Sequence, residues 1–138
     1  MNEPILLVEN DPGDRELVLI ALEGCARIAA AADGPQALEH LLADAPRLVI
    51  LDLNLPGMHG LEVLERIRSD GRTRRQPVVI FSSSGAERDR KAAYDLGVNS
   101  YVQKPAGFVE FSRVVKELAR YWLDVNLPPP GRVSAAAP

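Results

Sequence analysis

Short apolar runs alternate along this chain with longer stretches of helical periodicity. Runs of four apolar residues occupy 5–8, 48–51 and 78–81, and each is too short to form a helix. Such a run is typical of a strand buried on both faces of a sheet. Two weaker strands are expected at about 26–31 and at 100–103. The chain is therefore expected to contain five strands.

Five other segments carry apolar residues at the spacing of an amphipathic helix. They begin after Asp11-Pro12, after 33–35 and after Gly60, and they run from about 87 to 96 and from 108 to 122. Asp11 and Pro12 are typical of an N-cap followed by proline at the first helical position. Strands that alternate with helices predict right-handed crossovers. The expected fold class is therefore α/β, a doubly wound and mostly parallel sheet with helices on both faces.

Polar residues follow directly on four of the predicted strands. They are Glu9 with Asn10, then Asp52, Ser82 and Lys104. In an open parallel sheet the active crevice lies at the carboxyl ends of the strands, at the point where the strand order reverses. We therefore expect these side chains to meet in one site.

The residue types in this set favour phosphoryl transfer to Asp52. Carboxylates such as Glu9 and Asp52 repel each other unless a cation lies between them, and hard oxygen ligands suit Mg²⁺. Lys104 would contribute a mobile positive charge and Ser82 a hydroxyl donor. An aspartate with a metal ion, an ammonium and a hydroxyl around it can accept a phosphoryl group.

Length and charge exclude several other classes of protein. The 138 residues fit one domain, and the net charge of −3 suggests neither a nucleic-acid surface nor a polybasic membrane patch. No apolar run approaches the length of a membrane span. The single cysteine, Cys25, cannot form an internal disulfide. These features favour a cytoplasmic protein with no nucleic-acid or membrane partner.

Four motifs together resemble the receiver domain of two-component response regulators, the family that includes CheY. They are Ile5-Leu6-Leu7-Val8-Glu9-Asn10-Asp11, Leu51-Asp52-Leu53-Asn54-Leu55-Pro56-Gly57 with Gly60, Phe81-Ser82-Ser83, and Tyr101-Val102-Gln103-Lys104-Pro105. The resemblance extends from the first strand to about Tyr121. It implies a flavodoxin-like, CheY-like sheet of five parallel strands in the order 2-1-3-4-5, with five helices.

The family resemblance also implies a role for each matching residue. Asp52 would be the phosphoacceptor, supplied by the phosphohistidine of a sensor histidine kinase. Lys104 would bind the phosphoryl group, and its peptide bond to Pro105 would be cis. Ser82 would be the hydroxyl switch residue, and Tyr101 the aromatic residue that turns inward on phosphorylation.

The implied Mg²⁺ ligands are Glu9, Asn10, Asp52 and the backbone carbonyl of Asn54. Asn10 departs from the family pattern, in which this position is commonly an aspartate that contacts the metal. Asp11 is not an attractive substitute, because strand alternation turns its side chain elsewhere and it is better placed as a helix cap. An amide oxygen can bind Mg²⁺, but it brings no formal charge.

The segment 119–128 resembles single-domain regulators associated with bacterial phytochromes. That resemblance implies a kinase partner of the bacteriophytochrome type. It also implies a homodimer formed through the fourth helix, the fifth strand, the fifth helix and a C-terminal extension. The expected interface residues are Tyr121, Trp122 and Leu123. The receiver domain would then span 1–121, and 122–138 would be an extension that is partly interface and partly disordered.

The expected function is a signalling switch that is not an enzyme beyond its own phosphotransfer and autodephosphorylation. One alternative is a pseudo-receiver, an interaction module that is no longer phosphorylated, and only Asn10 favours it. Another is a phosphatase of the haloacid-dehalogenase type. Those enzymes need a second acid two residues after the nucleophile, where this chain has Asn54, and their nucleophile follows the first strand.

Overall fold

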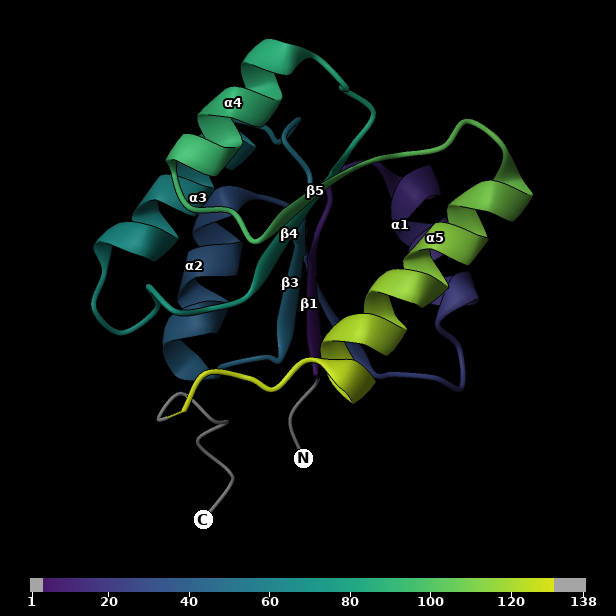
Figure 1. Cartoon of the computed structure of the whole chain (residues 1–138), viewed down its shortest axis with the longest axis horizontal. Helices are drawn as coiled ribbons and strands as arrows, with labels where there is room; N and C mark the ends of the chain where they lie inside the picture. The colour runs from purple at the N-terminus through teal and green to yellow at the C-terminus, as the bar shows by residue number, and fades with distance from the viewer. Residues whose placement is uncertain (1–3, 131–138) are drawn as a thin grey trace.

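The computed structural model describes residues 4–130, which form one parallel sheet flanked by helices (Figure 1). The strands lie in the order β2-β1-β3-β4-β5, as predicted. Their bounds are Ile5–Val8 for β1, Ile28–Ala31 for β2, Leu48–Leu51 for β3, Val78–Ser82 for β4 and Ser100–Gln103 for β5. The helices are α1 (Pro12–Ala21), α2 (Gly34–Ala43), α3 (Gly60–Ser69), α4 (Glu87–Asp95), α5 (Phe108–Arg120) and a π-helix, η1 (Tyr121–Val125). The predicted fold class is confirmed.

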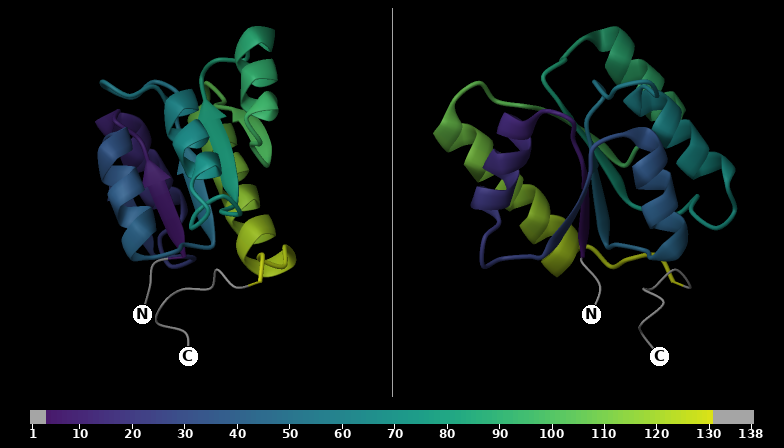
Figure 2. Two further views of the ribbon diagram at one scale, coloured as in Figure 1. Left: turned by 90° about the vertical axis from the view of Figure 1, so that its left-hand side faces the viewer. Right: turned by 180° about the vertical axis from the view of Figure 1, so that it is seen from behind.

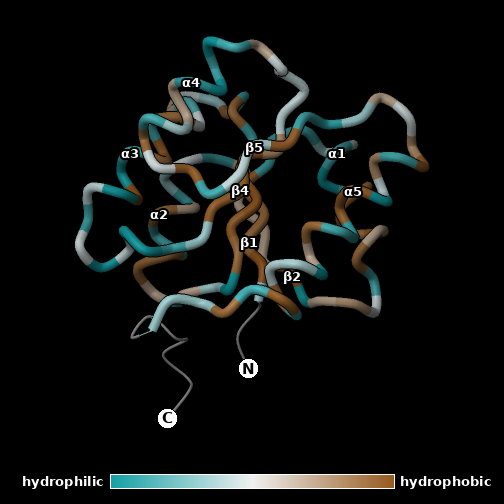
Figure 3. The backbone as a smooth tube through the Cα atoms, in the orientation of Figure 1, coloured by the Kyte–Doolittle hydropathy of each residue, from teal (hydrophilic) through white to brown (hydrophobic). Residues whose placement is uncertain are grey.

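Two hydrophobic layers cover the two faces of the sheet. Helices α1 and α5 lie on one face, and α2, α3 and α4 lie on the other (Figure 2). Along β1, Leu6 and Val8 pack toward α2 and α3, whereas Ile5 and Leu7 pack toward α1 and α5. Figure 3 shows the resulting concentration of hydrophobic residues along the central strands. This double burial explains why the strands have continuous apolar sequences.

The register of the sheet sets where the candidate site lies. Parallel pairing places Val8 beside Leu51, so the residues that follow them, Glu9 and Asp52, emerge at the same edge. Because β1 lies between β2 and β3, the crossovers leave β1 and β3 in opposite directions at this edge. The strand order therefore creates a crevice between the carboxyl ends of β1 and β3.

The C-terminal helix differs from its predicted extent. Phe111 and Val115 are buried against the sheet, but Phe108, expected in the same apolar stripe, is 58% exposed. It is the first residue of α5 and lies beyond the region where the helix contacts the core. After Arg120 the helix widens into η1, which sequence periodicity did not indicate.

No helix within residues 4–130 is long and apolar enough to cross a lipid bilayer.

Candidate functional site

Three of the predicted residues are buried at the carboxyl edge of the sheet. Glu9 follows β1, Asp52 follows β3, and Ser82 is the last residue of β4. Their exposed fractions are 2%, 5% and 0%, respectively. Burial of two neighbouring carboxyl groups is unfavourable unless a positive charge compensates them.

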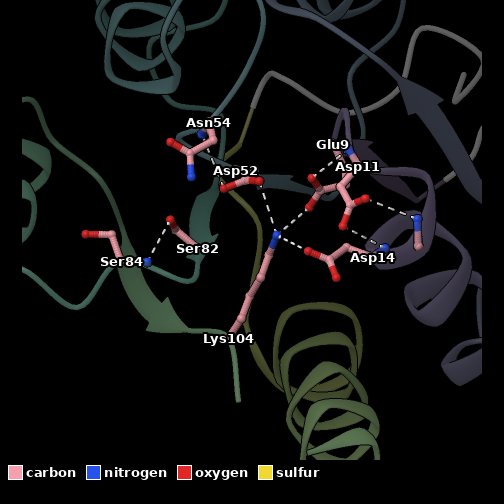
Figure 4. Close-up of polar contacts among 9 residues, drawn as sticks. Glu9, Asp11, Asp14, Asp52, Asn54, Ser82, Ser84 and Lys104 are labelled. Carbon is pink, nitrogen blue, oxygen red and sulfur yellow. Dashed lines mark hydrogen bonds and ion pairs between the residues drawn. The ribbon is translucent and has the colours of Figure 1, made fainter. Parts of the chain in front are cut away.

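The compensating charge comes from Lys104, the residue that follows β5. Its Nζ lies 2.7 Å from Glu9 Oε1, 3.1 Å from Asp52 Oδ2 and 2.7 Å from Asp14 Oδ2 (Figure 4). The side chain of Lys104 is only 8% exposed. Its backbone N–H donates to the carbonyl of Ser82 at 2.7 Å, which anchors the residue beside the end of β4. The structure thus brings together Glu9, Asp52 and Lys104, as the sequence predicted.

Asp14 is the fourth member of this cluster, and sequence reasoning missed it. It lies in the first turn of α1, and its side chain is 29% exposed. The signal was present, because a helix that begins at Pro12 directly after β1 starts at the same edge of the sheet. Its first-turn acid therefore faces the strand ends.

Burial raises the pKa of Glu9 to about 7, and the neighbouring Asp52 carboxylate acts in the same direction against the opposing effect of Lys104. For Lys104, burial lowers the pKa, but hydrogen bonds to Asp14 and Glu9 and the negative charges of Glu9 and Asp52 outweigh it. The net effect holds the pKa of Lys104 above its usual value. The ammonium is therefore charged at neutral pH, while Glu9 exchanges a proton near neutrality.

The raised pKa of Glu9 predicts a stability that falls as pH rises from about 5 to about 8. The folded protein binds a proton at Glu9 that the unfolded chain, with a pKa near 4.5, has already lost. The stabilisation is complete below pH 4.5 and is lost as pH passes about 7. Urea unfolding in a chelating buffer should show a decrease on the order of 1 to 2 kcal/mol. The Glu9→Gln variant should lack this component, and an identical pH slope in that variant would assign the effect to another group.

Asp11 and Asn10 occupy different environments. Asp11 caps α1, and its carboxylate accepts from the N–H groups of Gly13 and Asp14, each at 3.4 Å. Its own N–H donates to Glu9 Oε2 at 3.2 Å. The prediction that Asp11 is a helix cap is confirmed. Asn10 is exposed at the mouth of the crevice.

The oxygen atoms around Asp52 suit a divalent cation, although acidic side chains alone do not provide enough ligands for one. Within the described residues there is no group of three histidine, cysteine or acidic side chains that could hold a metal ion. The available ligands are two carboxylates, from Glu9 and Asp52, together with the Asn10 amide and the Asn54 carbonyl. Such a set suits Mg²⁺, which takes few protein ligands and retains water. Three carboxylates that share one ammonium also leave negative charge for a further cation.

Ser82 and Tyr101 are hydrogen-bonded to the loop that connects β4 and α4. Ser82 Oγ accepts from the N–H of Ser84 at 3.2 Å, and Tyr101 Oη donates to the carbonyl of Ser84 at 2.8 Å. Ser84 Oγ in turn donates to Asp89 Oδ2 at 2.6 Å, at the start of α4. The two predicted switch residues are thus joined through one residue, Ser84.

The predicted cis bond between Lys104 and Pro105 is wrong for this structure. The peptide bonds of residues 4–130 include no cis bond, so the Lys104–Pro105 bond is trans. A trans bond before proline is favoured by about 0.5 to 1 kcal/mol unless the surrounding structure imposes cis. Lys104 reaches its three carboxylate partners from the trans geometry.

Comparison with known proteins gives one consistent family. Residues 5–116 match the response regulator receiver domain. Response regulator Rcp1 of Synechocystis is 35% identical over 138 residues, covering 90% of this chain and 92% of Rcp1. A solved structure of Rcp1 in its Mn²⁺-bound form superposes with a TM-score of 0.85 and covers 93% of this chain and 99% of that one.

Two further solved structures are regulators of phytochrome systems. The phosphorylated cyanobacterial phytochrome response regulator RcpA is 35% identical, with a TM-score of 0.88 and coverage of 94% of this chain and 99% of that one. The bacteriophytochrome response regulator RtBRR is 42% identical, with a TM-score of 0.71 and coverage of 96% and 87%. The chain therefore belongs to the response regulator receiver domain family, as a homologue of phytochrome response regulators.

Proposed function

We propose that Asp52 accepts a phosphoryl group and that the acyl phosphate switches the contacts of this protein with its partners. The observation that carries the proposal is the placement of the Lys104 ammonium 3.1 Å from Asp52 Oδ2 in a buried crevice. A cation at that position can stabilise the negative charge on the oxygens of a phosphoryl group in transit.

The chemistry requires little of the protein beyond positioning. A carboxylate oxygen of Asp52 attacks phosphorus, and the bond from phosphorus to the donor breaks, with the electron pair leaving on the donor atom. Lys104 pairs with a phosphoryl oxygen, and Ser82, whose Oγ accepts from the N–H of Ser84, can donate its hydroxyl proton to another. Mg²⁺, held by Glu9, Asn10, Asp52 and the Asn54 carbonyl, would neutralise charge on the phosphoryl oxygens.

Phosphorylation by acetyl phosphate with Mg²⁺ tests the proposal directly. Intact-protein mass spectrometry should show one phosphoryl adduct on the wild-type chain and none on Asp52→Asn. The adduct should persist in Asp95→Asn, a control that removes an exposed aspartate in a surface ion pair. An unmodified wild type would instead support the pseudo-receiver alternative, and an adduct on Asp52→Asn would place the acceptor elsewhere.

We further propose that the donor is the phosphohistidine of a sensor kinase of the phytochrome type. The support is the similarity to RcpA and RtBRR, whose names assign them to phytochrome systems.

We propose a homodimer formed through α4, β5, α5 and the segment that follows α5. A groove of about 570 Å³ runs between β5 and α5, and Ser100, Val102 and Leu118 line it together with Tyr121 and Trp122. The Tyr121 ring stands edge-on against Trp122, with 5.1 Å between ring centroids, and Tyr121 is 47% exposed. An aromatic pair beside an apolar groove is typical of a protein interface.

The described part of the proposed extension, residues 122–130, begins within η1, which follows directly on α5. Leu123, the third expected interface residue, lines a separate hollow with Leu22 and Cys25 and packs toward α1. The interface proposal therefore depends on Tyr121 and Trp122. The predicted disorder near the C-terminus concerns in part residues 131–138, which lie outside the described residues.

Replacing Tyr121 with glutamate should dissociate the dimer, because it places a charge in the apolar groove between β5 and α5. Size-exclusion chromatography with light scattering at micromolar concentration gives the mass of each species. Ile20→Glu is the matched control, since Ile20 is 50% exposed on α1 and does not line the groove between β5 and α5. A monomeric wild type, or equal dissociation by both variants, would contradict the proposed interface.

A further inference from the structure

Asp14 occupies a position that the proposed chemistry leaves without a role. Its carboxylate lies 2.7 Å from Lys104 Nζ, as close as Glu9 and closer than Asp52. The N–H of Asp14 donates to the capping carboxylate of Asp11, which fixes the first turn of α1 at the edge of the crevice. The contact between Asp14 and Lys104 joins residues 90 positions apart, so it is set by the fold.

The three carboxylate partners of Lys104 differ in exposure. The side chains of Glu9 and Asp52 are 3% and 6% exposed, whereas that of Asp14 is 29% exposed. Glu9 and Asp52 are the proposed ligands of a divalent cation, and Asp14 is not. The Lys104 ammonium therefore spans two inner carboxylates and one outer carboxylate.

A divalent cation bound to Glu9 and Asp52 would repel the ammonium that now contacts both of them. Two positive charges a few ångströms apart in a partly buried site cost free energy that water screens only in part. The flexible stem of lysine allows the ammonium to move while the backbone stays fixed. Without a partner at the outer side of the crevice, the ammonium would lose its last carboxylate contact or hold the cation out.

We propose that Asp14 is a positioning residue that retains the Lys104 ammonium at the edge of the crevice when a divalent cation takes its place on Glu9 and Asp52. The inference rests on the proposed function and deepens it, because it assigns a residue to the exchange of one cation for another. From the edge of the crevice, the Lys104 ammonium can pair with an oxygen of a phosphoryl group on Asp52. Asp14 couples binding of the divalent cation to the position of the lysine.

Mg²⁺ binding to the full chain, measured by isothermal titration calorimetry, tests this role without a phosphoryl donor. Asp14→Asn should bind Mg²⁺ more weakly by roughly fivefold or more, the lower range of typical coupling between sites. Asp14→Glu, which restores the carboxylate, should recover most of the affinity. Unchanged Mg²⁺ affinity in Asp14→Asn would overturn the proposal.

Asp11→Asn is the matched control, because it removes the same charge three residues away and asparagine caps a helix as well as aspartate does. Asp11 has no contact with Lys104 among the three ion pairs of the ammonium. Its replacement should change Mg²⁺ affinity by less than about twofold, since only screened long-range attraction is lost. An equal loss in both variants would show that total charge, and not the lysine contact, sets the affinity.

A double-mutant cycle with Lys104→Met separates the two routes by which Asp14 could act. If Asp14 acts through the lysine, Asp14→Asn should have little effect on Mg²⁺ affinity in the Lys104→Met background. A loss that persists there would mean that Asp14 attracts the cation directly, and the proposal would fail. The comparison of Asp14 with Asp11 in the native background remains decisive if Lys104→Met does not fold.

This test and the phosphorylation test can fail independently. An absent adduct on Asp52 with a positive Mg²⁺ cycle would reject phosphoacceptor function and leave the role of Asp14 standing. A normal adduct on Asp52, together with a Mg²⁺ affinity that does not depend on the contact between Asp14 and Lys104, would support phosphoacceptor function and reject the role of Asp14.

Discussion

Lys104→Met should slow the phosphorylation of Asp52 by acetyl phosphate by about 10² to 10³-fold, the range for removal of one charge-stabilising donor from a transition state. The variant keeps an unbranched side chain one atom shorter than lysine but removes the ammonium that contacts Glu9, Asp14 and Asp52. Time-resolved intact mass spectrometry at fixed Mg²⁺ measures the rate.

The same variant should unfold more readily when divalent cations are chelated. Removal of one partner from a buried ion pair costs roughly 3 to 5 kcal/mol, and proton uptake by Glu9 offsets part of that loss. We expect a net loss of about 2 to 4 kcal/mol at pH 7.5, with a substantial recovery on addition of Mg²⁺.

Lys91→Met provides the matched control for both measurements. Lys91 pairs with Asp95 at 2.9 Å, but its side chain is 77% exposed. An exposed pair of this kind contributes about 0 to 1 kcal/mol, and it includes none of the acids that contact Lys104. Equal effects of the two lysine variants would show that burial of Lys104 among acids has no special consequence.

Gly60→Ala should destabilise the protein by roughly 3 kcal/mol or more, the upper range for forced overpacking. A Cβ at Gly60 would overlap the carbonyl oxygen of Asp52 and lie 2.6 Å from the Cα of Leu53. Both are backbone atoms, so rotation of a side chain cannot relieve the overlap. The N–H of Gly60 also donates to the carbonyl of Leu53 at 2.9 Å, which ties the start of α3 to the loop after Asp52.

Helix propensity alone predicts the opposite sign for this substitution. Alanine is favoured over glycine in a helix by about 0.5 to 1 kcal/mol, but the clash with backbone is the larger effect. Urea unfolding measures the change in stability, and the phosphorylation rate should fall because the backbone of Asp52 must move. Gly71→Ala is the control, since a Cβ there meets nothing within 4 Å, and it should be neutral or slightly stabilising. An unchanged stability of Gly60→Ala would contradict the prediction and show that the loop after Asp52 can shift to accommodate the added methyl group.

The strands, the helices α1 to α5, the fold class and the core of the candidate site were predictable from the sequence, whereas η1 was not. Four-residue apolar strands and the cap at Asp11 are set by neighbouring residues, so local pattern is enough to predict them. The meeting of Glu9, Asp52 and Lys104 followed from one topological rule about parallel sheets. It needed only the position of each residue at a strand end.

Contacts between residues that are distant in the chain could not be predicted from the local sequence. Asp14 joins Lys104 across 90 residues, and the Arg47 guanidinium donates to the carbonyl of Leu123 at 3.1 Å, within η1. Arg68 likewise donates to the carbonyls of Gly97 and Gln76, each at 2.8 Å, and so ties the end of α3 to the segments that precede β5 and β4. The sequence pattern around a charged side chain in a helix or loop does not indicate which residue will be its partner. The partners are determined by packing of the sheet and helices, which brings the groups together in space and excludes water from between them.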